Sequence, residues 1–435
     1  MADKREVVVL SAARSAVGTF NGTLAGMEPA DLGGLVIKEA IARSGVDPKA
    51  VTFATVGNVV PTEARYAYVH RNATIQGGMS MESVAFQVNR LCGSAQQAIV
   101  NSAQAILLGD ADFAIGGGVE VMSRGVYMSP AMRSGARMGD TKMLDAMVCA
   151  LTDPFGVGHM GVTAENLAKK HGLTREMQDE FACESQRRAA AAIAAGYFKE
   201  QIVPITIKTR KGDVVFDTDE HVKAGTTMEA LAKMKPAFDK AGTVTAGNAS
   251  GINDGAGFLV LADAAKAAAG GHKAMARLVA YGIGGVPNDV MGEGPIPSTR
   301  IALAKAGLKI EDIGVVAARG WLGRVAGFGL DIKTTPAISA ATTASSWARV
   351  FGVGTDETPY GSRTWPLRND ISDIVCRIGA GRRHRRQAAR RLSGDKQRHA
   401  VQSVSAQAAD GGGGKSSGLC RWRNRRQDGP SPILR

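Results

Sequence analysis

The feature that most constrains the fold is a repeated pairing of a short, β-branched run with an apolar helical segment. Residues 6–10, EVVVL, form a continuously apolar run, which is typical of a strand buried on both faces. Residues 30–46, ADLGGLVIKEAIARSGV, carry apolar side chains at helical spacing and reach Gly45, a natural helix C-cap. The chain therefore begins with a buried strand followed by a helix.

The same alternation continues along the next 75 or so residues. Buried strands are predicted at 51–60 (VTFATVGNVV) and 85–89 (AFQVN), and the second leads directly into an apolar helix at 91–110 that Gly109 closes. Residues 113–123, FAIGGGVEVMS, read as a strand that enters a glycine-rich turn. Alternating strands and helices predict an α/β fold, with a parallel or mixed sheet covered by helices on both faces.

Residues 120–248 differ from this pattern, because they are more polar and rich in methionine. They include a predicted helical pair at 163–198, and we interpret the whole segment as an insertion that returns to the sheet at Thr243. A binding lid and a plain helical decoration are both compatible with such an insertion.

An internal echo follows the insertion. Residues 40–51, AIARSGVDPKAV, match residues 302–313, ALAKAGLKIEDI, in the order of small, apolar, basic and glycine positions. A duplicated strand–helix unit explains the match economically, and chance is the alternative for a single match of this length.

The charge of the chain is concentrated in its last part. Of 53 basic and 40 acidic residues in the whole chain, 21 basic and 8 acidic residues lie at 317–435, so the net charge of +13 resides there. All four tryptophans also follow residue 316. This tail contains arginine runs and a glycine-rich stretch and has no sustained period of a helix or strand.

The five cysteines (Cys92, Cys149, Cys183, Cys376 and Cys420) show neither CxxC nor zinc-ligand spacing. No disulfide framework and no metal site are therefore expected. The N-terminal apolar run is too short for a secretory signal, and no stretch has the roughly 18 apolar residues of a membrane span. The plain expectation is a cytoplasmic protein.

Cys92 lies between a predicted strand and a predicted helix, in the stretch NRLCGSAQQ. First-turn amides and the helix dipole favour a thiolate at such a position, and Gly93 lets a substrate approach the backbone. This context suits a nucleophile for acyl transfer. From spacing alone, a small buried hydrophobic residue is an equally good interpretation.

Five motifs bear on this choice: NRLCGS, IGGGVEVMS, GHMGVTAEN, TAGNASGINDGA and GEGPIP. In this order they resemble the thiolase family, in particular bacterial acetoacetyl-CoA thiolases and β-ketothiolases, over about residues 3–316. The resemblance implies an acyltransferase in which Cys92 takes an acyl group from a 3-ketoacyl-CoA or from acetyl-CoA. It also implies coenzyme A as substrate, no permanently bound cofactor, no metal, and a homo-oligomer (dimer or tetramer).

The resemblance further implies the thiolase fold, a layered αβαβα arrangement of two similar halves with a loop domain inserted in the first. The domains would then be 1–119 with 249–270 (N-terminal α/β domain), 120–248 (loop domain for coenzyme A and oligomer contacts), 271–316 (start of the C-terminal domain) and 317–435 (divergent tail).

The coenzyme A contacts implied by the resemblance come from the inserted segment and the strand that follows it. His159 and Met160 would line the pantetheine tunnel. Ser250 would touch pantetheine, with Ala246 beside it and Phe238 covering it. Lys223 occupies a position near the nucleotide phosphates where relatives often carry arginine, and it would supply a cation without the bidentate fork.

Other interpretations of these residues exist. A lone histidine is more often a surface or core residue, and Asn248, Gly251 and Asn253 could simply build a turn. The glycines at 116–118 invite comparison with a phosphate-binding loop, but close packing fits their context better.

Thiolases take further catalytic groups from their second half: a GHP histidine, a CxG cysteine and an NEAF asparagine. No such motif stands in this sequence; where NEAF should follow 313–316 (IGVV), the chain reads AARGWLGRVAGF. CRIGAG at Cys376 is interpreted as a chance likeness, and His384 lacks the flanking glycine and proline. A shifted reading frame explains the abrupt change in composition, and a truly evolved tail is the alternative.

Three functions therefore compete. The first is a thiolase-type acyltransferase, and the second is a non-catalytic binder of coenzyme A or acyl-CoA. The third is nucleic-acid binding through the tail, with Trp422 stacking on bases. Arginine runs are more often solvated charge and no nucleic-acid-binding module is visible, so acyl-CoA is the expected partner, without nucleic acid or membrane.

Overall fold

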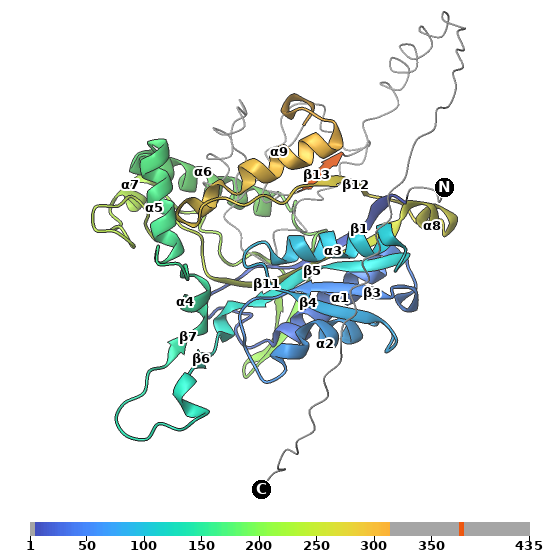
Figure 1. Cartoon of the computed structure of the whole chain (residues 1–435), viewed down its shortest axis with the longest axis horizontal. Coiled ribbons are helices and arrows are strands. Elements are labelled where there is room, and N and C mark those ends of the chain that lie inside the picture. The colour runs from blue at the N-terminus through green and yellow to red at the C-terminus, as the bar shows by residue number, and fades with distance from the viewer. Residues whose placement is uncertain (1–4, 314–373, 378–435) are drawn as a thin grey trace, which may run out of the picture. The chain divides into compact units, whose positions relative to one another are not determined.

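The computed structural model describes residues 5–313 and 374–377, all within a compact unit that spans residues 1–379. A mixed β-sheet forms the centre of this unit, and helices cover both of its faces (Figure 1). The α/β class expected from the alternating strands and helices is confirmed.

The strands of the sheet do not follow one another in chain order. β3 runs parallel to both of its neighbours, whereas β11 runs antiparallel to both of its own. From one edge to the other, the order is β13 (Ile374–Arg377), β12 (Ala276–Tyr281), β1 (Val7–Ser15), β11 (Asn253–Asp263), β5 (Phe113–Val121), β3 (Phe53–Gly57) and β4 (Val84–Val88). Two short strands, β2 (Gly18–Thr19) and β8 (Ile202–Val203), pair with β11 and β1.

Two helices end where their glycines predict. α1 (Pro29–Ser44) ends at Gly45, whose φ is 68°, and α3 (Ser94–Leu108) ends at Gly109, whose φ is 90°. Both values lie in the left-handed region that glycine adopts without a Cβ penalty.

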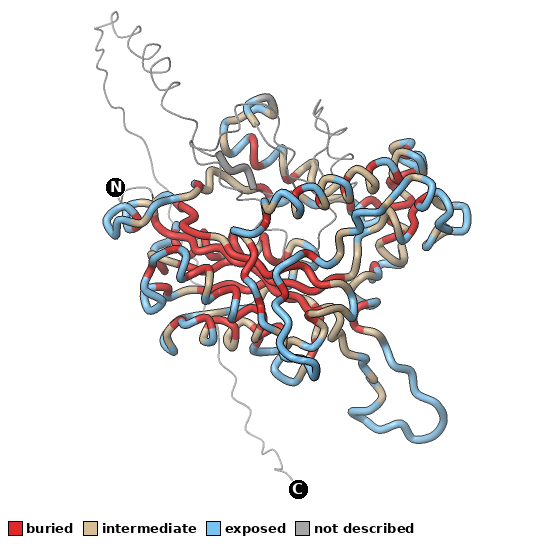
Figure 2. Tube along the Cα trace, turned by 180° about the vertical axis from the view of Figure 1, so that it is seen from behind, coloured by how far each residue is buried: buried red, intermediate tan, exposed pale blue. Residues whose placement is uncertain are grey.

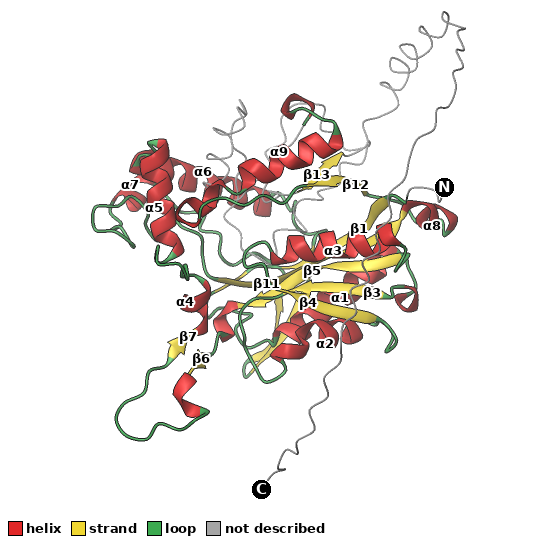
Figure 3. Ribbon diagram, viewed as in Figure 1, coloured by secondary structure: helices red, strands yellow, loops and turns green. Residues whose placement is uncertain are grey.

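The two faces of the sheet carry separate apolar cores. α1 packs on one face, where Ile37 and Ile41 join strand residues such as Phe258 in one cluster. α3 packs on the opposite face, where Ile99 and Ile106 join a second cluster. α2 (Val69–Gln76) lies with α1 below the sheet in the view of Figure 3, and α3 lies above it.

The three glycines of β5 allow very close packing. A Cβ on Gly116 would lie 2.7 Å from the Cα of Ile99, and one on Gly118 would lie 2.9 Å from the Cβ of Ala95. A Cβ on Gly117 would lie 2.2 Å from the carbonyl oxygen of Gly257 on the neighbouring strand. The preference for close packing over a phosphate-binding loop is confirmed.

β4 corrects one expectation. The sequence led us to expect a buried, central strand before Cys92, yet no residue of β4 is buried and Val84 is 58% exposed. The reason is its place in the sheet, because in the part of the chain that the structure describes only β3 pairs with it. Figure 2 shows the contrast with the buried strands at the centre of the sheet.

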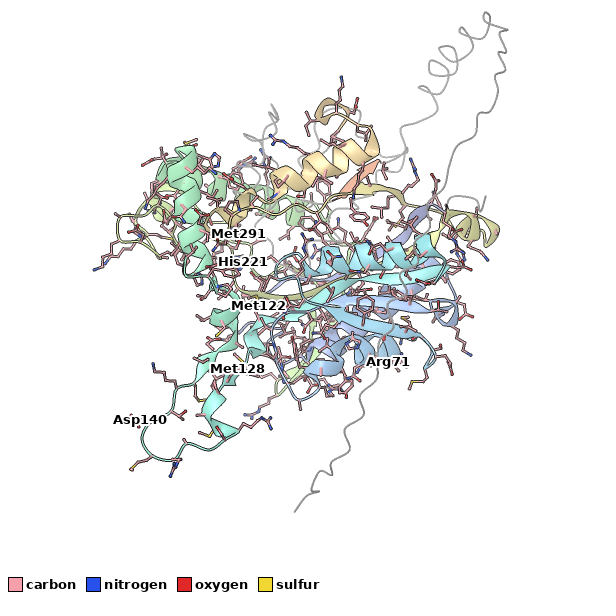
Figure 4. The ribbon with its side chains drawn as sticks, viewed as in Figure 1. Arg71, Met122, Met128, Asp140, His221 and Met291 are labelled. Atoms are coloured by element: carbon pink, nitrogen blue, oxygen red, sulfur yellow. The ribbon has the colours of Figure 1, made fainter. Side chains whose placement is uncertain are left out.

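The predicted helical pair of the inserted segment is confirmed as α5 (Met160–His171) and α6 (Arg175–Ala194). Residues 125–145 make a long exposed excursion, and Figure 4 shows Met128 and Asp140 on it, away from the sheet. The remaining elements are β6 (Tyr127–Met128), β7 (Leu144–Asp145), α4 (Ala146–Ala150), β9 (Ile205–Thr209), β10 (Gly212–Phe216) and α7 (Met228–Ala232).

The internal echo has the same local structure in both copies. α1 ends at a left-handed glycine and is followed by a 3-10 turn at Pro48–Ala50. After α8 (Ala264–Ala269), α9 (Pro295–Ala306) likewise ends at Gly307, with φ of 65°, and is followed by a 3-10 turn at Ile310–Asp312.

Most of the predicted tail lies outside the described residues, including His384 and Trp422. The exception is β13, four residues long, which pairs antiparallel with β12 and sets Cys376 opposite Leu278.

Candidate active site

Cys92 lies in a tight turn between β4 and α3, two residues before the helix begins. Its side chain is exposed, so the interpretation as a buried hydrophobic residue is wrong. Leu91, directly before it, has a φ of 47°, which is uncommon for a residue other than glycine. Strained backbone of this kind is often found where a side chain must be held in one direction.

Hydrogen bonds within the turn hold this conformation. The amide of Arg90 donates to the hydroxyl oxygen of Ser94 at 2.8 Å, and that hydroxyl donates to the carbonyl of Leu91 at 2.6 Å. The amide of Gly93 donates to the carbonyl of Arg90 at 3.0 Å. Ser94 is buried, so the turn is closed from the inside while Cys92 faces outward.

The first turn of α3 rests directly on the sheet. A Cβ on Gly57, at the end of β3, would lie 2.6 Å from the amide nitrogen of Ala95. Gly118 on β5 meets the same residue, Ala95, from the neighbouring strand. Two glycines on adjacent strands therefore fix the height and direction of the helix that follows Cys92.

A buried glutamate, Glu120, lies on β5 two residues after Gly118. Glu120 accepts hydrogen bonds from the amides of Val59 and Val60, at 2.9 and 3.1 Å, and from the side-chain amide of Asn58 at 3.2 Å. Burial raises the pKa of Glu120 to about 8, against the lowering effect of the two backbone hydrogen bonds. The signals in the sequence were a charged residue inside an otherwise apolar strand and its place in the motif IGGGVEVMS.

A second buried carboxyl group follows on the neighbouring strand. Asp254 accepts hydrogen bonds from the backbone amide and the hydroxyl group of Ser123, at 3.0 and 2.6 Å. Burial raises the pKa of Asp254 above its ordinary value. This aspartate thereby fixes the turn that follows β5.

The candidate coenzyme A residues His159 and Phe238 lie in contact. Their rings stack with centroids 4.8 Å apart and planes inclined by 16°. Gly161 makes room for this pair, because a Cβ there would lie 2.2 Å from the ring of Phe238. Met160 is the first residue of α5, directly after His159.

The ring of His159 has a defined orientation. Its Nδ1 accepts a hydrogen bond from the amide of Gly161 at 3.1 Å, so Nε2 carries the proton in the neutral ring. Burial lowers the pKa of His159, which favours the neutral ring at neutral pH. The residue therefore presents a single N–H donor.

Ala246 and Ser250 are exposed in the loop that leads into β11. Asn248 organises this loop, since its side chain accepts from the amide of Thr245 at 2.7 Å and donates to Asp179 of α6 at 2.8 Å. Asn248 therefore builds a turn as expected, whereas Asn253 belongs to β11 and donates to the carbonyl of Gly18. Both candidate residues are accessible.

A buried glutamate joins this loop to α5. Glu165 accepts hydrogen bonds from the amides of Thr243 and Val244, at 2.9 and 2.7 Å. Pro236 and Thr245 also form an isolated antiparallel bridge, which brings the Phe238 segment beside the same loop. Four candidates, His159, Met160, Phe238 and Ala246, therefore belong to one connected region.

Lys223 lies beside α6, where its backbone amide donates to the side chain of Gln186 at 2.9 Å. The lysine side chain is exposed. A buried ion pair fixes the preceding residues, because both terminal nitrogens of Arg14 bind the carboxylate of Asp219, at 2.7 and 3.1 Å.

Among the residues that the structure describes, no group of three or more His, Cys, Asp or Glu side chains could hold a metal ion. Within residues 5–313 and 374–377, every helix is either too short or too polar to cross a membrane.

Comparison with known proteins extends these observations. The family description "Thiolase, N-terminal domain" matches residues 7–265. The β-ketothiolase BktB of Cupriavidus necator is 55% identical over 315 residues, which are 72% of this chain and 80% of that protein. An acetyl-CoA acetyltransferase of Escherichia coli is 46% identical over 320 residues, 72% of this chain and 80% of that protein.

Solved structures agree with this. The acetyl-CoA acetyltransferase of Bacillus anthracis superposes with a TM-score of 0.76 and 37% identity, covering 80% of this chain and 91% of that one. Human mitochondrial 3-ketoacyl-CoA thiolase in complex with CoA gives a TM-score of 0.76 and 35% identity, covering 81% and 91%. The fold, the matched residues and these relatives together show that the chain belongs to the thiolase family of acyltransferases.

Proposed function

We propose that this protein is a thiolase-type acyltransferase that condenses acetyl-CoA units or cleaves 3-ketoacyl-CoA through an acyl-Cys92 intermediate. The observation that carries the proposal is the exposed Cys92, held in a strained turn before α3, in a chain 55% identical to a β-ketothiolase. A thiol in this setting is accessible to a thioester and directed by the surrounding backbone.

In the cleavage direction, the Cys92 thiolate attacks the 3-keto carbonyl of the substrate. The bond between that carbonyl carbon and the neighbouring CH₂ breaks, and its electron pair leaves as the enolate of acetyl-CoA, which takes up a proton. The thiol of coenzyme A then attacks the acyl-Cys92 thioester and releases the shortened acyl-CoA. Condensation is the same sequence in reverse.

We propose that coenzyme A binds as substrate across the region formed by α5 and the loop before β11. His159 would donate from Nε2, Phe238 and Met160 would contact the pantetheine arm, and Ala246 and Ser250 would border it. Lys223 would meet a phosphate as a single exposed cation. The name of a solved relative, human 3-ketoacyl-CoA thiolase in complex with CoA, supports this ligand.

We also propose the domain division expected from the resemblance: 1–119 with 249–270, the inserted 120–248, and a second domain that begins at 271. A homo-oligomer fits the edge strand β4, whose Val84 and Phe86 are exposed beside a free row of backbone groups in the described part of the sheet. The cytoplasm fits the free cysteines Cys92, Cys149 and Cys183.

The second candidate is a binder of coenzyme A or acyl-CoA that performs no chemistry. It is favoured by one observation, because the GHP, CxG and NEAF motifs that complete the thiolase site are not in the sequence. General acid–base groups of this kind contribute about 10²–10⁴-fold each, so their loss can reduce turnover below detection.

Two measurements on the full chain separate the candidates: calorimetric titration with coenzyme A, and thiolysis of acetoacetyl-CoA. The acyltransferase is supported if the chain binds coenzyme A and turns over acetoacetyl-CoA. Cys92→Ser should then abolish the turnover, and Cys149→Ser should leave it unchanged. Binding without turnover supports the second candidate, and the lack of any binding contradicts both.

A further inference from the structure

Glu120 lies on the same side of the sheet as α3. Side chains alternate along a strand, so Gly116, Gly118 and Glu120 of β5 share one face. Gly116 lies against Ile99 and Gly118 against Ala95, so moving along β5 means moving toward the beginning of α3. Glu120 is the next position on that face, beyond the first helical turn and toward the Cys92 turn.

The hydrogen bonds of Glu120 reach the same turn by a second route. Its carboxyl group accepts hydrogen bonds from the amides of Val59 and Val60, which come two and three residues after Gly57, the last residue of β3. Gly57 in turn lies against the backbone of Ser94 and Ala95. Fixing residues 58–60 therefore fixes the surface on which the first turn of α3 rests.

A third connection runs through β4. The backbone amide of Asn58 donates to the carbonyl of Val88 at 3.3 Å, and Val88 is the last residue of β4 before the Cys92 turn. The side chain of Asn58 donates to Glu120 and to the carbonyl of Val119. Both ends of the turn, the strand before it and the helix after it, are thus tied to residues 58–60.

We propose that Glu120 is a positioning residue for Cys92, acting by holding residues 58–60 against both the end of β4 and the start of α3. This inference rests on the proposed role of Cys92 as nucleophile. Glu120 itself makes no contact that would qualify it as a catalytic group, and its effect passes through the backbone.

The protonation state of Glu120 matters because its carboxyl group is an acceptor for three N–H groups. The titratable groups that act on it are Asp254 of β11 and Tyr66 of the 3-10 turn Tyr66–Tyr68, whose hydroxyl donates to the carbonyl of Val59 at 3.0 Å. Burial raises the pKa of Asp254 and of Tyr66, and to about 8 that of Glu120. Glu120 therefore changes charge within the range in which thiols react.

The test is the rate at which iodoacetamide alkylates Cys92 in the full chain, measured peptide by peptide from about pH 6 to about pH 10. Cys149 and Cys183 serve as internal controls in the same molecule. We expect Glu120→Ala to slow the alkylation of Cys92 about tenfold and Glu120→Gln to react nearly as fast as the native chain. Neither variant should alter the alkylation rates of Cys149 and Cys183.

The pH profile distinguishes positioning from general stability. We expect two inflections for Cys92 in the native chain, one of them near pH 8, and a single inflection in Glu120→Gln. Glu63→Gln is the matched control, because burial also raises the pKa of Glu63, and it should keep both inflections. Should Glu120→Ala fail to fold, the Glu120→Gln profile still decides.

An unchanged profile in Glu120→Gln would overturn the inference. Alkylation does not require acyl chemistry, so the two proposals fail separately. If the alkylation of Cys92 changes in the Glu120 variants but Cys92 never accepts an acyl group, only the proposed function is contradicted. If Cys92 becomes acylated but its alkylation is the same in the Glu120 variants, only the positioning role is contradicted.

Discussion

β11 and β4 are both apolar strands of one sheet, yet every residue of β11 is buried and none of β4 is. β11 lies between β1 and β5, and helices cover it on both faces. β4 pairs only with β3 among the described residues. The comparison shows that neighbours in the sheet, rather than strand composition, decide burial. It also shows that Cys92 follows a strand with no buried residue, so its position depends on contacts outside that strand.

The largest effect should come from the centre of the sheet. Gly117→Ala places a Cβ 2.2 Å from a backbone oxygen of β11, which cannot move without breaking the pairing of the strands. We expect a loss of about 4 kcal/mol or more in the free energy of unfolding, measured by urea denaturation.

Gly26→Ala is the matched control, because a Cβ at Gly26 meets no atom within 4 Å. It should change stability by less than about 0.5 kcal/mol. Equal losses in the two variants would contradict the tight packing assigned to β5 and β11.

The next effect concerns the charge buried at β1. Arg14→Met leaves the carboxylate of Asp219 inside the protein with no guanidinium opposite it, at an expected cost of about 3 kcal/mol. The double variant with Asp219→Leu should recover most of that loss. Arg277→Met, which breaks an exposed pair with Glu6, should cost less than about 1 kcal/mol. If the double variant is as unstable as Arg14→Met alone, the unpaired carboxylate of Asp219 is not the cause of the lost stability.

A smaller effect is expected from pH at the end of β5. The pKa of Glu120 is raised to about 8 in the folded chain, above its ordinary value of 4.5. Its contribution to stability is therefore full below about pH 4.5 and is lost as the pH rises through about 8. Between pH 6.5 and 9, the native chain should lose on the order of 2 kcal/mol relative to Glu120→Gln, measured by chemical denaturation. If stability depends on pH in the same way in the native chain and in Glu120→Gln, the raised pKa of Glu120 is contradicted.

The smallest effect on stability should come from the exposed strand. Val84→Lys on β4 removes little buried area, because Val84 is 58% exposed, so we expect a change below about 1 kcal/mol in the free energy of unfolding. If a second copy covers this edge, as we propose, the same variant should shift sedimentation toward monomer. A loss of several kcal/mol without any change in sedimentation would mean that β4 is part of the monomer core.

Local signals in the sequence predicted much of this fold. Gly45 and Gly109 marked the ends of two helices, because left-handed backbone favours glycine, and the glycines at 116–118 marked close packing. The edge position of β4 was not predictable, since it depends on which strands pair across long distances in the chain. The role of Glu120 was hidden for the same reason, because its partners at 58–60 are about 60 residues away.

The candidate site was predictable only in part. The stacking of His159 on Phe238 joins residues far apart in the sequence, through space that Gly161 provides. Their proposed coenzyme A contacts, and that of Lys223, remain predictions, as does the frame of the tail, which resequencing the gene after the codon for Val316 would test.

The most direct test is mass spectrometry of the full chain after incubation with acetyl-CoA, followed by mapping of the modified peptide. We predict one acetyl group per chain, carried by the peptide that contains Cys92, removed by added coenzyme A and not formed in Cys92→Ser. Cys149, which is also exposed, should remain unmodified under the same conditions. Acetylation spread equally over Cys92 and Cys149, or a Cys92 that stays free at saturating acetyl-CoA, would contradict the claim that this turn presents an acyl-accepting nucleophile.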